Sequence, residues 1–75
     1  MDWSKRHPGT RHFQELFAFE HLPPHLRAVS APIAELADDL VHELPDGPEL
    51  SAGLRKLLEA KDCMVRAKVL QIAGE

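Results

Sequence analysis

The sequence contains no tyrosine, a single cysteine and only four aromatic side chains, all of which precede residue 20. One cysteine excludes an intramolecular disulfide framework, and no charged and apolar leader marks the chain for secretion. No apolar run approaches the roughly 18 residues that a membrane-spanning helix needs. We therefore expect a cytoplasmic protein without a membrane partner, and 75 residues with 44% apolar content suit one small domain.

Basic residues are too few for a general nucleic-acid binder. A net charge of -3 leaves no broad basic patch for a DNA or RNA polymer. The charge is also uneven, because residues 13–50 carry eight acids against Arg27 alone, whereas residues 51–75 carry five bases and three acids. Two interpretations fit this asymmetry. The two segments pair as antiparallel helices, or the basic segment also forms a pocket for a small anion.

Residues 54–72 form the longest stretch without glycine or proline and predict one amphipathic helix. Its main apolar face is made of Leu57, Leu58, Met64, Val65, Val69 and Ile72. The back carries a thinner row of small and apolar side chains, made of Ala60, Cys63, Ala67 and Leu70. A single neighbouring helix cannot cover both rows. We therefore expect contact with the rest of the chain on one face and with another molecule, such as a second copy, on the other.

Prolines indicate where the other predicted helix begins, where it bends and where it ends. The prolines at 23 and 24 suit the first turn of a helix that runs to about residue 44, in which Pro32 predicts a bend or a break. The following PDGPE predicts a tight turn and a second helix start, with Asp46 and Glu49 forming a capping box. So short a connection makes the two helices antiparallel neighbours.

The predicted fold class is therefore all-α, an antiparallel helical hairpin. We expect a flexible arm over residues 1–12 and a hairpin domain over 13–75, with helices at about 23–44 and 49–73 and a turn at 45–48. Two helices leave much apolar surface in water, so we expect a homo-oligomer. The phenylalanines at 13, 17 and 19 either form a short helical turn that closes the open end of the hairpin or stack on a nucleobase.

Two lysines, Lys61 and Lys68, fall inside the main apolar face of the second helix. Their methylene groups either cover the core while the ammonium reaches an acid on the facing helix, or Lys61 joins Arg55 and Arg66 in a phosphate site. His21 and His25 have metal-ligand spacing, but two prolines separate them, so we expect no metal and no cofactor. No nucleophile has a base at a recognisable spacing, so we do not expect an enzyme.

Residues 17–67, FAFEHLPPHLRAVSAPIAELADDLVHELPDGPELSAGLRKLLEAKDCMVRA, resemble short hairpin proteins of actinobacterial phages. These are similar to the hairpin domain of the phage anti-CBASS and anti-Thoeris cyclic nucleotide sponges. The resemblance covers about two thirds of the chain, and its most recognisable parts are HLPPHL, LPDGPE and LRKLLEAKD.

The resemblance implies a non-catalytic hexamer that sequesters cyclic di- or trinucleotide immune signals in the cytoplasm of an infected bacterium. It implies that Phe19 stacks on a base and that Arg55 contacts phosphate. The family has tyrosine at the aromatic position and a lysine in the first helix, where this chain has Phe19 and Ala34, so Lys61 or Arg27 would supply the missing charge. The ligand-binding candidates are thus Phe19, His21, Arg27, Arg55, Lys61 and Arg66. The alternative function is a protein-binding adaptor without a nucleotide ligand.

Overall fold

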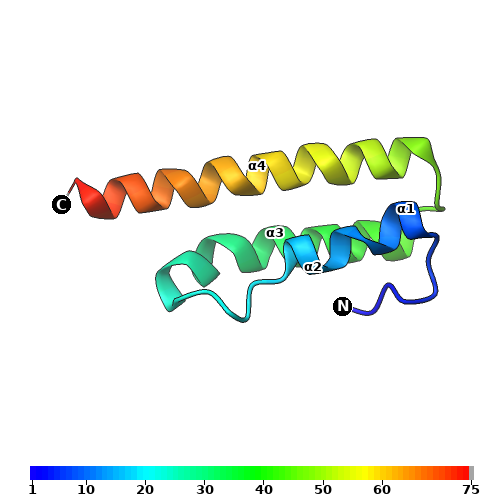
Figure 1. Cartoon of the computed structure of the whole chain (residues 1–75), viewed down its shortest axis with the longest axis horizontal. Helices are drawn as coiled ribbons and strands as arrows, with labels where there is room; N and C mark the ends of the chain where they lie inside the picture. Colours follow the sequence, from blue (N-terminus) through cyan, green and yellow to red (C-terminus); the bar gives the residue numbers. More distant parts are fainter. Residues whose placement is uncertain (75) are drawn as a thin grey trace.

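Four helices and their connections make up residues 1–74, the part of the chain that the computed structural model describes. They are α1 (Pro8–Arg11), α2 (Phe13–Phe17), α3 (Pro24–Glu43) and α4 (Pro48–Ala73). No strand occurs in this part of the chain, so the all-α class predicted from the sequence is confirmed. The long helices α3 and α4 lie side by side and run in opposite directions, and α1 and α2 lie against one side of this pair (Figure 1).

Helix α3 presents small side chains to the interior. Its buried residues are Ser30, Ala34, Ala37 and Val41, which let neighbouring elements approach the helix closely. The helix begins at a proline, which needs no backbone N–H in the first turn. Pro32 lies within one continuous helix and is exposed. The alternative of a break at Pro32 is therefore wrong.

Helix α4 begins at Pro48, after Gly47 in an extended conformation that favours glycine, with φ of 157°. The predicted capping box is wrong, because no side chain caps this helix start. The Asp46 carboxylate instead accepts hydrogen bonds from Arg6 Nε at 3.0 Å and from the His7 backbone N–H at 3.1 Å. The turn is thus held by the N-terminal segment rather than by the helix that follows it.

The N-terminal segment differs from the flexible arm expected for residues 1–12. Trp3 is fully buried, and its indole Nε1 donates to Asp38 Oδ1 at 2.8 Å. The Arg6 guanidinium donates to the backbone carbonyls of Val41 and Leu44, which lie at the end of α3 where carbonyl groups lack helical partners. The prediction missed these contacts because isolated aromatic and basic residues in an irregular segment carry no periodic signal.

The core forms where α1 and α2 meet the long helices. It contains Trp3, Phe13, Phe17, Ala34, Ala37, Val41, Leu50 and Leu54. The rings of Trp3 and Phe17 are tilted at 56° with centroids 6.2 Å apart, which is a favourable aromatic geometry. Phe13 and Phe17 are therefore structural residues. Only two residues of α4 are buried, Leu50 and Leu54, and the helix extends past the start of α3 (Figure 1).

Among residues 1–74 there is no helix with both the length and the apolar content needed to cross a membrane.

Candidate functional site

A small cavity beside α4 brings two of the predicted ligand-binding residues together. It has a volume of about 270 Å³ and is lined by Leu22, Ser30, Lys61, Asp62, Val65 and Arg66. We call it the basic pocket. Lys61 and Arg66 are five residues apart on α4, whereas Ser30 comes from α3 and Leu22 from the connection before it. The pocket therefore forms only when the two long helices pack together.

Lys61 is anchored in this pocket. Its side chain is 12% exposed, and Nζ donates to the carbonyl oxygen of Leu16 at 2.7 Å. Leu16 lies in the last turn of α2. A cation at that end of a helix can donate a hydrogen bond to a free carbonyl and also interacts favourably with the helix dipole. The lysine methylenes are covered as the structural interpretation expected, but the ammonium meets a carbonyl rather than an acid on the facing helix. Because an ammonium carries three N–H groups, Lys61 retains donors for a ligand.

Ser30 is the residue that sequence reasoning missed at this site. It has no exposed surface, and its Oγ is buried without a hydrogen-bond partner in the described part of the chain. An unpaired buried hydroxyl costs free energy. The sequence does contain a signal for Ser30. Its helical spacing places this polar residue on the same buried side of α3 as the apolar Ala34, Ala37 and Val41.

The remaining charge in the basic pocket is modest. Arg66 is exposed, and its Nη1 lies 3.9 Å from Cys63 Sγ. The Asp62 carboxylate lies 3.8 Å from Lys61 Nζ and offsets one of the two positive charges. The pocket thus has a net charge of about +1, enough to favour a small anion over a cation.

Arg55 and Phe19 lie outside the basic pocket. The Arg55 guanidinium sits 5.5 Å above the centre of the Phe13 ring, a cation–π contact on the side covered by α1 and α2. Phe19 is half-buried and packs against the core. The backbone N–H groups of Glu20 and Phe19 hold the pKa of the Glu20 carboxyl below its ordinary value. A carboxylate is therefore fixed beside Phe19, which works against an anionic ligand at this ring.

His21 and Arg27 are both exposed, and neither lines the pocket. The structure thus unites two of the six predicted residues, Lys61 and Arg66, and leaves Phe19, His21, Arg27 and Arg55 outside that cavity.

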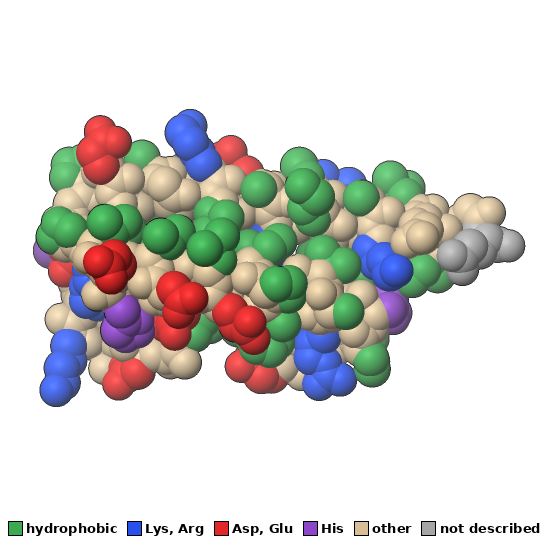
Figure 2. Space-filling model, turned by 180° about the vertical axis from the view of Figure 1, so that it is seen from behind, with side chains coloured by type: hydrophobic (Ala, Val, Ile, Leu, Met, Phe, Trp, Pro, Cys, Tyr) green, Lys and Arg blue, Asp and Glu red, His purple; other side chains and the backbone are tan. Residues whose placement is uncertain are grey.

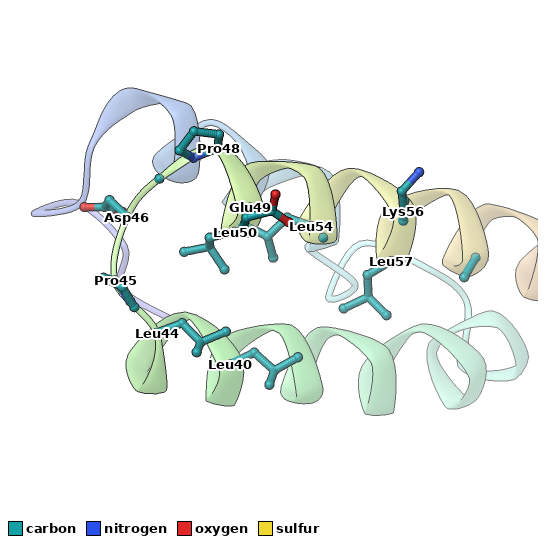
Figure 3. A pocket seen from close by; sticks show the side chains of 13 residues that line it. Leu40, Leu44, Pro45, Asp46, Pro48, Glu49, Leu50, Leu54, Lys56 and Leu57 are labelled. Carbon is teal, nitrogen blue, oxygen red and sulfur yellow. The ribbon is translucent and has the colours of Figure 1, made fainter.

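A larger, apolar groove lies between α3 and α4 beside the turn. Its volume is about 600 Å³, its floor is formed by Leu50, Leu54 and Leu57, and one wall is formed by Leu40 and Leu44. These side chains point toward one another across the gap between the two helices (Figure 3). Apolar side chains continue along the same face of the molecule beyond this groove (Figure 2).

A third hollow of about 370 Å³ belongs to the contacts of the N-terminal segment with the turn. Its lining includes His7, Thr10, Asp46 and Ser51. The nearby Thr10 hydroxyl, the His7 N–H and the Arg6 guanidinium favour the charged form of the Asp46 carboxyl and lower its pKa. This hollow is part of a structural contact.

No three His, Cys, Asp or Glu side chains within residues 1–74 come close enough to hold a metal ion. Comparison with protein-family models, with curated proteins and with solved structures gives no match to this chain.

Proposed function

We propose that the protein binds and sequesters a cyclic di- or trinucleotide without transforming it. The observation that carries this proposal is the basic pocket, where Lys61 and Arg66 line one cavity together with Ser30. Lysine and arginine donate charge-assisted hydrogen bonds to phosphate oxygens, and these bonds are stronger than neutral ones. The context implied by the resemblance, the cytoplasm of an infected bacterium, belongs to the same proposal.

The pocket size limits what part of such a ligand it takes. A cavity of about 270 Å³ has room for a phosphate with part of its ribose, but not for a whole cyclic dinucleotide. The rest of the ligand therefore lies outside this cavity. We include in the proposal that the protein acts as a homo-oligomer, so that residues such as Arg55 or Phe19 take part only where a neighbouring copy brings them to the pocket.

Calorimetric titration with a panel of cyclic di- and trinucleotides tests the proposal. A single charge-assisted hydrogen bond contributes about 1.5–3 kcal/mol, so Arg66→Ala should weaken binding roughly ten- to a hundredfold. Arg11→Ala is the matched control, because Arg11 is exposed on α1 and does not line the pocket. The proposal fails if no cyclic nucleotide binds the wild-type protein, or if both variants bind equally well.

The second candidate function is that of a protein-binding adaptor, which the apolar groove between α3 and α4 favours. Amphipathic helices bind in grooves of this kind with their apolar side chains inserted. An adaptor would show no affinity for any nucleotide in the panel. It would also bind its partner equally well after Arg66→Ala, because Arg66 does not line the groove.

A further inference from the structure

One whole face of the α3–α4 pair is left uncovered by α1 and α2. We call it the open face. Its first row lies on α3 and contains Ile33, Leu36, Leu40 and Leu44, and its second row lies on α4 and contains Gly53, Leu57, Ala60 and Met64. Leu36 is 48% exposed, Leu44 44% and Met64 56%, which is unusual for large apolar side chains arranged in rows. Figure 2 shows a band of hydrophobic side chains along the molecule.

We propose that the open face binds the open face of a second copy of this chain. The two copies are related by a two-fold axis parallel to α3 and α4, so that α3 of each copy lies on α4 of the other. Every helix then has antiparallel neighbours, as in a four-helix bundle. This inference rests on the assembly part of the proposed function and does not depend on nucleotide binding.

The sizes of the side chains in the two rows favour this arrangement. The α3 row is bulky throughout, whereas the α4 row alternates small residues with Leu57 and Met64. At Gly53, no atom other than those of its chain neighbours and of the backbone of its own helix lies within 4 Å of the position that a Cβ would occupy. The leucines of one copy therefore have space above Gly53 and Ala60 of the other. Packing α3 on α3 would instead set bulky rows against each other and leave the space above the small residues of α4 empty.

The charges at the edges of the open face select the same arrangement. The outer edge of α3 carries Glu35, Asp39 and Glu43 at intervals of four residues, so all three lie along one line of the helix. Packing α3 on α3 would bring these acids together. Lys56, at the outer edge of α4, lies eight residues after the start of that helix, and Glu35 lies eight residues before the end of α3, one turn from Asp39. Packing α3 on α4 brings Lys56 of one copy near the acids at positions 35 and 39 of the other.

The area of the open face is adequate for a stable dimer. The molecule measures 43 by 20 by 17 Å, and the open face runs along its long axis. A standard specific interface buries about 800 Å² on each partner, which a face of this size provides. The interface would also cover Leu36, Leu40 and Leu44, which a single chain leaves 38–48% exposed.

A charge-swap experiment without nucleotide tests the proposal. Asp39→Lys and Lys56→Glu should each weaken the wild-type dimer by roughly tenfold or more, because each creates two like-charge contacts across the two-fold axis. An equimolar mixture of the two variants should recover wild-type affinity as a heterodimer, since both contacts then join opposite charges. Sedimentation velocity at micromolar concentrations measures the masses, and circular dichroism checks that each variant remains helical.

Glu15→Lys is the matched control for charge, because Glu15 is exposed on α2, away from the open face. It should leave the dimer unchanged. A wild-type species of 8.4 kDa that stays monomeric overturns the proposal. It is equally overturned if Asp39→Lys tightens the dimer, which would indicate α3 on α3, or if the mixture associates no better than either variant alone. Nucleotide titration of the same samples reports separately on the basic pocket.

Discussion

Trp3 Nε1 donates a hydrogen bond of 2.8 Å to Asp38 Oδ1 and thereby joins the start of the chain to the middle of α3. The Trp3 side chain is fully buried, and the backbone N–H of the same residue donates to Gln14 Oε1 at 2.8 Å. One residue therefore ties three segments together. Because these contacts link residues far apart in the sequence, the N-terminal segment and the long helices should unfold in one transition.

Trp3→Phe should keep most of the aromatic volume and remove the hydrogen bond to Asp38. A hydrogen bond to a charged group contributes about 1.5–3 kcal/mol, so the free energy of unfolding should fall by that order. Urea denaturation followed by circular dichroism measures the loss. The double-mutant cycle with Asp38→Ala separates this bond from changes in packing, and a coupling free energy near zero would show that the bond does not contribute.

Asp46 should make stability depend on pH at acidic values. Its pKa is lowered in the folded protein from an ordinary 3.8, so its stabilising contribution is complete above that value and is lost as the pH falls through the lowered pKa. Asp46→Asn should therefore lower the melting temperature at about pH 6 and have a shrinking effect below about pH 4. Thermal melts of both proteins across this range measure the difference. A difference that stays constant with pH would contradict the role of the carboxylate.

Ser30→Ala should stabilise the protein. The substitution removes a buried hydroxyl without a hydrogen-bond partner and places a better helix former in α3, with a gain on the order of 1 kcal/mol. Ser51→Ala is the matched control, because Ser51 Oγ donates to the Gly9 carbonyl at 3.0 Å, so its loss should destabilise. Urea denaturation gives both values. Equal signs for the two substitutions would show that the Ser30 hydroxyl is satisfied in solution.

Gly53→Ala and Gly47→Ala should have opposite effects on stability. Gly53 lies inside α4 with open space around its Cβ position, so alanine should stabilise the helix by about 0.5–1 kcal/mol in dilute solution. Gly47 has φ of 157°, which L side chains rarely adopt, so alanine should strain the turn there. Differential scanning calorimetry compares the two variants. A stabilised Gly47→Ala protein would show that the turn relaxes to another conformation.

The sequence was sufficient to predict the regular part of the fold. Apolar periodicity and prolines predicted helices at about 23–44 and 49–73, and the structure has them at Pro24–Glu43 and Pro48–Ala73. Both signals act within a few turns of helix and need no knowledge of distant residues. The burial of Trp3 and the Arg6 contacts to Val41 and Leu44 depend on pairings across more than thirty residues, which no local pattern predicts.

The candidate site was predictable only where helical spacing decides the outcome. Lys61 and Arg66 are only five residues apart on α4, and both line the same cavity. Ser30 joins them only through the packing of α3 on α4, whereas the Arg55 guanidinium lies over the Phe13 ring, outside the pocket. Sequence reasoning left Phe19 either in a short helical turn or stacked on a base, and in the structure it follows α2 and is partly covered by the core. Contacts between elements, rather than propensities, determined these positions.

The unequal lengths of α3 and α4 imply a gradient of amide hydrogen exchange. Helix α3 has 20 residues and α4 has 26, so the last turns of α4 extend past the start of α3 (Figure 1). Leu70 there is 65% exposed, whereas Leu54 is 2% exposed. Local opening needs least free energy where tertiary contacts are fewest. Exchange should therefore be slowest near Leu54 and quicken steadily toward Ile72, and any molecule that covers the end of α4 would flatten that slope.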